Sequence, residues 1–132
     1  MLEGLNVLVV DDNSDSRVLV SVILETYGAQ AREVASAQAA LEAIAEIQPD
    51  LIICDLHMPG QDGCSFIRQL RSLPPEQGGQ IPAIALSGAS DEEKNQALAC
   101  GFEQFFLKPV DPDGLIEVIT TLIQPASSLK ES

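Results

Sequence analysis

The sequence has few aromatic residues and few basic ones. Its 132 residues include no tryptophan, one tyrosine and four phenylalanines, and 7 lysines and arginines stand against 20 aspartates and glutamates. The net charge of −13 repels nucleic acid and anionic lipid, so neither is expected as a direct partner. Every apolar run is far shorter than the roughly 18 residues of a membrane span, and the first four residues lack the basic start of a secretory signal. The cytoplasm is therefore the expected compartment.

Cysteine is also scarce. Cys54, Cys64 and Cys100 are an odd number without a C-x-x-C pair, which argues against a disulfide framework and favours reduced thiols. With His57, the first two supply metal-ligand types, but their spacing matches no zinc pattern. Cys54 also ends an apolar run, where a buried thiol is usual. We therefore predict free thiols and no zinc.

Strand-like and helix-like segments alternate along the chain. Short apolar runs that favour β-structure occur at residues 5–10, 51–54, 81–86 and 102–107, and a weaker, more polar one occurs at residues 29–34. Each is followed by apolar residues at helical spacing with a capping or stop signal, such as Gly28, an N-cap at Ser36, a capping box from Ser90 to Glu93, or Asp111 before a proline. Parallel strands require crossover helices, so this alternation predicts one α/β domain with a doubly wound parallel sheet. We expect the domain to span residues 1–124, and residues 125–132 to be a polar tail or the start of a linker.

Polar side chains follow four of the five predicted strands. Asp11 and Asp12 end the first, Asp55 the third, Ser87 the fourth and Lys108 the fifth. Each residue alone is ordinary as a turn or capping residue. Ligands of open α/β sheets, however, bind beyond the carboxyl ends of the strands, where all of these side chains would meet.

Converging carboxylates repel one another unless a cation lies between them. Oxygen ligands favour a hard ion, so Mg²⁺ (or Mn²⁺) that also holds a phosphoryl group suits this set. An aspartate beside such an ion can act as the nucleophile and form an aspartyl phosphate. Lys108 would supply positive charge to one phosphoryl oxygen, and the Ser87 hydroxyl would donate a hydrogen bond to another.

Four segments in order, VLVVDDN, LIICDLHMPGQDG, IPAIALSG and FFLKPV, resemble the receiver (response regulator) domains of two-component signalling. The resemblance covers nearly the whole chain. It implies the strand order 2-1-3-4-5 with five flanking helices. It further implies that Asp55 is the phosphoacceptor, Asp12 a direct Mg²⁺ ligand, Asp11 an acidic partner acting largely through water, and the backbone carbonyl of His57 a further ligand.

The resemblance also implies a switching set. Ser87 and Lys108 match the hydroxyl and the lysine of the family, and Phe105 takes the place of its switching aromatic. An aromatic residue on a strand is equally well explained by core packing. The adjacent Phe106 must point to the other face of the sheet, where packing is the better explanation.

Two positions tune how long family members keep the phosphoryl group, and here they hold His57 and Ala89. Alanine cannot orient an attacking water, whereas the histidine can hydrogen-bond one or cover the site. We therefore expect slow autodephosphorylation.

The predicted function is a phosphorylation-dependent signalling switch without turnover of an external substrate. A histidine kinase or a His-containing phosphotransfer protein would phosphorylate Asp55, and the surface of the fourth helix, fifth strand and fifth helix would then control a downstream protein or an attached domain. The opening LEGLNVLVVDDN resembles receivers of hybrid histidine kinases, so an excised module and a free regulator are both compatible.

Three other functions compete with this one. A haloacid-dehalogenase-type phosphatase requires D-x-D near the first strand, whereas DLH follows the third. A flavodoxin-type module needs amides and hydroxyls in its first loop, where DDNSDS is acidic. A pseudo-receiver that only docks partners is the nearest rival, although the acceptor, the acidic pair, the hydroxyl and the lysine are all present.

Overall fold

Five parallel strands form one sheet in the order β2-β1-β3-β4-β5, as predicted. The structure is a computed structural model that describes residues 2–58, 62–88, 91–108 and 110–123, with the side chains of 91 and 92 left out. Ala89 and the tail at 125–132 lie outside the described residues. The strands are β1 (Asn6–Val10), β2 (Gln30–Val34), β3 (Leu51–Asp55), β4 (Ala83–Ser87) and β5 (Gln104–Leu107).

Five α-helices alternate with the strands. They are α1 (Ser14–Thr26), α2 (Ala37–Glu46), α3 (Gly63–Arg71), α4 (Asp91–Cys100) and α5 (Pro112–Ile123), and a short 3₁₀ helix covers Pro75–Gln77. The predicted caps are confirmed where they are described: Ser36 Oγ accepts from Ala39 N at 3.1 Å, and Asp111 Oδ2 accepts from Gly114 N at 3.1 Å. Gly28 follows α1 with a φ of +99°, a conformation that favours glycine.

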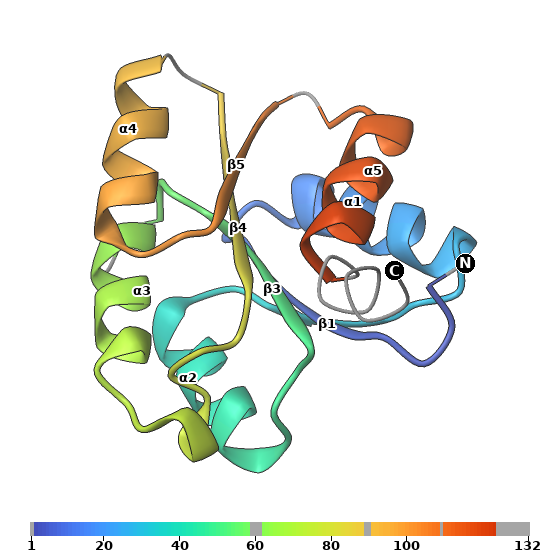
Figure 1. Ribbon diagram of the computed structural model, residues 1–132. Helices are drawn as coiled ribbons and strands as arrows, with labels where there is room; N and C mark the ends of the chain where they lie inside the picture. The colour runs from blue at the N-terminus through green and yellow to red at the C-terminus, as the bar shows by residue number, and fades with distance from the viewer. Residues whose placement is uncertain (1, 59–61, 89–90, 109, 124–132) are drawn as a thin grey trace, which may run out of the picture.

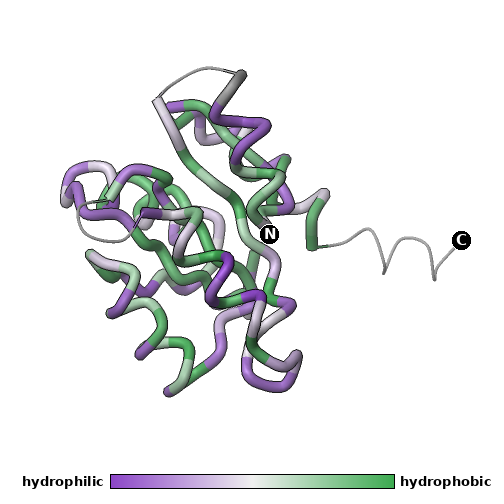
Figure 2. The backbone as a smooth tube through the Cα atoms, turned by 90° about the vertical axis from the view of Figure 1, so that its left-hand side faces the viewer, coloured by the Kyte–Doolittle hydropathy of each residue, from purple (hydrophilic) through white to green (hydrophobic). Residues whose placement is uncertain are grey.

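The helices cover both faces of the sheet (Figure 1). α2, α3 and α4 lie on one side, and α1 and α5 lie on the other. Because successive strand side chains alternate, Leu8 and Val10 of β1 pack toward α2 and α3, whereas Val7 and Val9 pack toward α1 and α5. Figure 2 shows the hydrophobic colouring concentrated along the strands and the inner sides of the helices.

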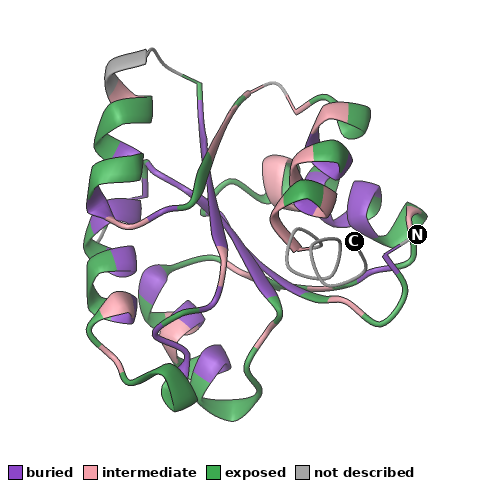
Figure 3. Cartoon of the chain, viewed as in Figure 1, coloured by how far each residue is buried: buried purple, intermediate pink, exposed green. Residues whose placement is uncertain are grey.

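Burial separates the central strands from the edges (Figure 3). Every residue of β3 and β4 is buried, whereas the edge strands β2 and β5 carry half-buried and exposed residues. This explains why the segment at 29–34 reads as a weak, polar strand in the sequence. None of the described helices combines the length and apolar character that a membrane crossing requires.

The buried face of α1 differs in part from the one that its apolar spacing suggests. Val18 and Val22 stand at helical spacing with Ile23 in the sequence, but they are 50% and 54% exposed. Ile23 is buried as that spacing suggests, and Val20 and Leu24 complete the face that packs on the sheet. Apolar residues line both sides of this helix, so periodicity alone could not select the inner side.

The prediction of three reduced thiols is wrong for two of them, because Cys64 and Cys100 form a disulfide with a Cα–Cα distance of 5.6 Å. They stand 36 residues apart in the sequence, and packing of α3 against α4 brings them together. The spacing of the two cysteines in the sequence does not indicate that contact. Cys54 is the buried free thiol that was predicted.

Candidate functional site

Three carboxylates meet at the carboxyl ends of β1 and β3. Val10 pairs with Cys54 in the sheet register, so Asp11 and Asp55 follow at neighbouring strand ends. Asp11, Asp12 and Asp55 each offer an oxygen, and these oxygens lie within 4.8 Å of one another. Asp11 and Asp55 are buried, and Asp12 is exposed. The sheet therefore brings together the acidic residues that the sequence singled out.

Lys108 closes the cluster from the end of β5. Its Nζ lies 3.4 Å from Asp11 Oδ2 and 3.4 Å from Asp55 Oδ2. The backbone N–H of Lys108 donates to the carbonyl of Ser87 at 2.8 Å, which fixes the lysine beside the end of β4. One ammonium group thus contacts two of the three carboxylates, and an excess of negative charge remains in the cluster.

Burial raises the pKa of Asp55 above its ordinary value. Two contacts oppose this effect: the backbone N–H of His57, which donates to Asp55 Oδ1 at 3.2 Å, and the Lys108 ammonium. The Asp11 carboxylate raises the pKa further by repulsion. Burial and repulsion from Asp11 therefore destabilise the charged form of Asp55, and an added cation would stabilise it.

Local contacts hold Asp11 in place. Its Oδ1 accepts from the N–H of Asn13 at 2.9 Å, and its backbone carbonyl accepts from Arg17 Nη1 at 2.8 Å. The Asn13 side chain in turn caps α1 by accepting from Ser16 N. The start of α1 therefore fixes one wall of the acidic cluster.

Glu93 is a site residue that sequence reasoning missed. One of its carboxylate oxygens accepts from the hydroxyl of the fully buried Ser87, and the other lies 2.8 Å from His57 Nε2. The Ser87 hydrogen bond is the main reason that the pKa of Glu93 is lowered. Its position had been explained by a capping box with Ser90, which lies outside the described residues. The sequence offers one signal for this contact: Glu93 is a carboxylate only six residues after the Ser87 hydroxyl at the end of β4.

The two aromatic residues of β5 point to opposite faces of the sheet, as predicted. Phe105 is half-buried and packs against the cluster on the α4 side of the sheet, and Phe106 packs against the cluster on the α1 and α5 side. Phe105 therefore lies on the side of the sheet that α4 covers.

The donor set fits a hard divalent cation. All three groups that converge are carboxylates, the preferred ligands of Mg²⁺ and Mn²⁺. Their charge exceeds that of Lys108, so a dication would complete the balance. Sulfur does not compete: Cys64 is bonded to Cys100, and Cys54 is buried beneath the strand end.

For Asp55 as the predicted acceptor, we expect Glu93→Gln to speed phosphorylation by a small phosphodonor. Removing a negative charge beside Ser87 relieves roughly 1 kcal/mol of repulsion toward an incoming phosphoryl group, which corresponds to about fivefold in rate. Intact mass followed over time measures the rate. The matched control is Glu25→Gln on the exposed end of α1. An unchanged or slower rate in Glu93→Gln alone contradicts this role.

Comparisons with known proteins agree with this geometry. A family model described as the response regulator receiver domain matches residues 7–120. An uncharacterized 14.6 kDa protein in the sodA1 3′ region of Leptolyngbya boryana is 39% identical over 119 residues, which is 89% of each chain. The sensor protein GacS of Pseudomonas syringae pv. syringae is 33% identical over 115 residues; they cover 86% of this chain but only 13% of that protein.

A solved structure with the same fold holds a magnesium ion. The receiver domain of the sensor histidine kinase PA1611 from Pseudomonas aeruginosa PAO1 has a magnesium ion coordinated in its active site cleft. It matches this chain with a TM-score of 0.83 at 26% identity, over 91% of this chain and 98% of that one.

Proposed function

Because the chain belongs to the response regulator receiver domain family, whose members are signalling modules and not enzymes, we propose that it is a phosphorylation-dependent switch. It accepts a phosphoryl group on Asp55 from the phosphohistidine of a histidine kinase or of a His-containing phosphotransfer protein. The observation that carries the proposal is the meeting of Asp11, Asp12 and Asp55 with Lys108 at one end of the sheet. We propose the cytoplasm as its compartment, because histidine kinases draw their phosphoryl groups from ATP.

A carboxylate oxygen of Asp55 attacks phosphorus, and the P–N bond breaks with its electron pair leaving on the imidazole nitrogen. Lys108 places its charge against a phosphoryl oxygen, and Ser87 donates its hydroxyl to another. Asp11, Asp12, Asp55 and the backbone carbonyl of His57 would hold Mg²⁺ or Mn²⁺. When bound, the ion neutralises charge on the phosphoryl oxygens.

The switch operates through an exchange of hydrogen bonds at Ser87. In the structure its hydroxyl is held by Glu93, so binding to the phosphoryl group requires it to leave that carboxylate. Release of Glu93 frees the first turns of α4, and the half-buried Phe105 turns inward toward the space that opens. The altered surface of α4, β5 and α5 then contacts a downstream protein or an attached domain.

The exposed apolar side of α1 suits the phosphodonor. Val18, Leu19 and Val22 are each about half exposed or more. They lie on the helix that begins at Ser14, two residues after Asp12, so a helix of the donor resting on them would bring its phosphohistidine to the cluster. Exposed apolar residues that flank a reactive group favour a protein partner over a small substrate.

We expect the phosphorylated state to decay slowly. Ala89 offers no group to orient a water, and the exposed imidazole of His57 is engaged by Glu93. The measurement is the intact mass at intervals after removal of the donor with Mg²⁺ kept present. Loss of the phosphoryl group within seconds would refute slow decay.

The test of the proposed function compares two donors. Phosphoramidate carries the P–N bond of phosphohistidine and should phosphorylate the protein once, without sustained release of phosphate. The ester p-nitrophenyl phosphate should give no continuous turnover. Steady hydrolysis of the ester would instead support a phosphatase, and failure of phosphoramidate with Mg²⁺ present would support a docking module without phosphotransfer.

A further inference from the structure

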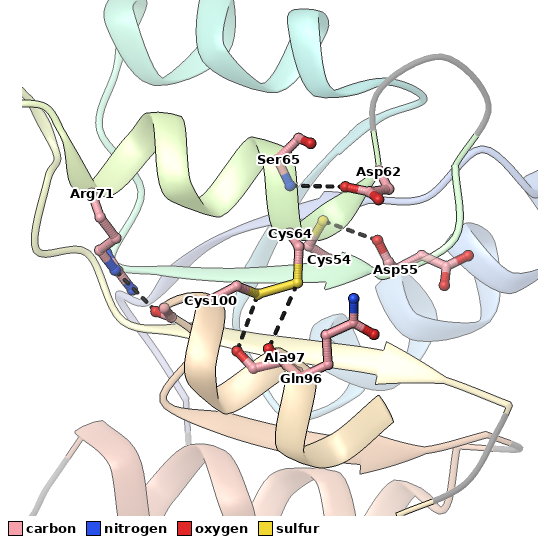
Figure 4. Close-up of a disulfide and its surroundings, with 10 residues drawn as sticks. Cys54, Asp55, Asp62, Cys64, Ser65, Arg71, Gln96, Ala97 and Cys100 are labelled. Carbon is pink, nitrogen blue, oxygen red and sulfur yellow. Dashed lines mark hydrogen bonds between the residues drawn. A yellow bond between two sulfur atoms is a disulfide. The ribbon is translucent and has the colours of Figure 1, made fainter. Parts of the chain in front are cut away.

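The disulfide joins two elements that border the site (Figure 4). Cys64 lies in the first turn of α3, and Cys100 is the last residue of α4. A methyl group added to Gly63 would lie 2.7 Å from the backbone carbonyl oxygen of Asp55, so the start of α3 packs directly on the end of β3. The other helix, α4, carries Glu93. The bond thus links the segment after the acceptor to the helix whose release would report phosphorylation.

In the reduced state both thiols of this pair have a local hydrogen-bond acceptor. Cys64 Sγ lies 3.8 Å from the carbonyl oxygen of Gln96, and Cys100 Sγ lies 3.3 Å from that of Ala97. Disulfide sulfurs have no hydrogen to donate, but after reduction each thiol has a carbonyl acceptor within reach. Reduction therefore leaves no buried donor unsatisfied.

The domain has the hydrophobic core that small disulfide-stapled proteins lack. Disulfides typically staple small secreted domains that lack a sufficient core, whereas this domain has an extensive buried cluster on each face of its sheet. In the reducing compartment that the proposed function implies, disulfides are usually transient and regulatory.

We propose that Cys64 and Cys100 form a reversible thiol–disulfide switch, in which the disulfide holds α4 against α3 and opposes the movement of α4 that transmits phosphorylation. Its signalling consequence rests on the proposed function, but the effect on α4 does not. The reaction partner is a low-molecular-weight disulfide, such as glutathione disulfide, or a dithiol in the reverse direction.

The exchange is balanced by that partner. One cysteine loses its proton, and its thiolate attacks a sulfur of glutathione disulfide, which releases one glutathione thiolate. The second cysteine thiolate then attacks the mixed disulfide, which forms the Cys64–Cys100 bond and releases the second glutathione. The two protein thiols lose two electrons and two protons, and two glutathione thiols result. Cys54 stays outside the exchange, because burial raises the pKa of its thiol.

The first experiment compares the full chain after treatment with glutathione disulfide or with dithiothreitol. Alkylation after denaturation should label Cys54 alone in the oxidised form and all three cysteines in the reduced form. Amide hydrogen exchange in α4 should be about tenfold faster after reduction, with α2 unchanged as the internal control. Equal exchange of α4 in the two forms, or oxidation that yields only glutathione adducts or linked dimers, overturns the proposal.

Single cysteine variants distinguish an effect of the Cys64–Cys100 bond from an effect of thiol modification elsewhere. Cys100→Ser and Cys64→Ser should each give the fast α4 exchange whichever reagent is used, and Cys54→Ala should keep the full redox response. Acetyl phosphate with Mg²⁺ should phosphorylate the oxidised form several-fold more slowly than the reduced form. Equal rates would remove the link to signalling, whereas no phosphorylation of either form would count against the role of Asp55 and leave the exchange result to decide the redox switch.

Discussion

Lys108→Met should lower the rate of Asp55 phosphorylation by about 10²- to 10³-fold, the loss typical when one preorganised donor to a developing charge is removed. In the structure the Lys108 ammonium lies 3.4 Å from both Asp11 and Asp55, where it also faces any phosphoryl group arriving at Asp55. Methionine keeps the length of the side chain but brings no charge. The measurement is the time course of intact mass with acetyl phosphate and saturating Mg²⁺.

The control is Lys94→Met, which makes the same change on the exposed surface of α4 and should leave the rate within about twofold of wild type, as surface changes usually do. Circular dichroism separates misfolding from lost chemistry. A folded Lys108→Met protein that is phosphorylated within threefold of wild type would remove Lys108 from the mechanism.

Asp12→Asn should raise the Mg²⁺ concentration that gives half-maximal phosphorylation by at least about tenfold, since changes around a metal site typically cost 10- to 100-fold in affinity. The residue is exposed, so the substitution leaves the core intact. Its carboxylate is one of three that converge, and the amide that replaces it carries no charge. Thermal melting at increasing Mg²⁺ provides a second measurement that needs no phosphotransfer.

Asp15→Asn removes a charge three residues away in the first turn of α1 and serves as the matched control. Its Mg²⁺ dependence should resemble that of the wild type. If Asp12→Asn and Asp15→Asn weaken the response to Mg²⁺ equally, general surface charge and not ligation is responsible.

Much of the fold was predictable because its signals are local. Alternating apolar runs and caps such as Ser36 and Asp111 located the strands and helices to within a few residues. The strand order is a different matter, because periodicity does not specify which strands pair. It came from the resemblance to a known family and is confirmed by the register.

The acidic cluster was also predictable, because parallel strands deliver their carboxyl ends to one side. Asp11 and Lys108 directly follow strands and Asp55 ends one, so their convergence needed no knowledge of side-chain contacts. Glu93 lies within a helix, and only the packing of α4 near the end of β4 brings it to Ser87.

The disulfide and part of the inner face of α1 were not predicted, for the same reason. Both depend on how helices pack, which the spacing of residues along one element does not report. Cys64 and Cys100 meet because α3 and α4 are in contact, and Val20 is buried where Val18 is exposed because of how α1 lies on the sheet.

Asp55→Asn is the variant that tests the acceptor, and it should fold at least as stably as the wild type. Burial raises the pKa of Asp55 in the folded protein, so its charged form disfavours folding above that pKa. A neutral asparagine removes this penalty at neutral pH. Loss of phosphorylation in this variant therefore cannot be attributed to unfolding, and thermal melting checks this directly.

The most direct measurement of the central claim is the intact mass of wild type and Asp55→Asn after incubation with acetyl phosphate and Mg²⁺. The account predicts that the wild type gains one phosphoryl group and that Asp55→Asn gains none. A phosphoryl group on folded Asp55→Asn, or an unmodified wild type under the same conditions, would contradict it.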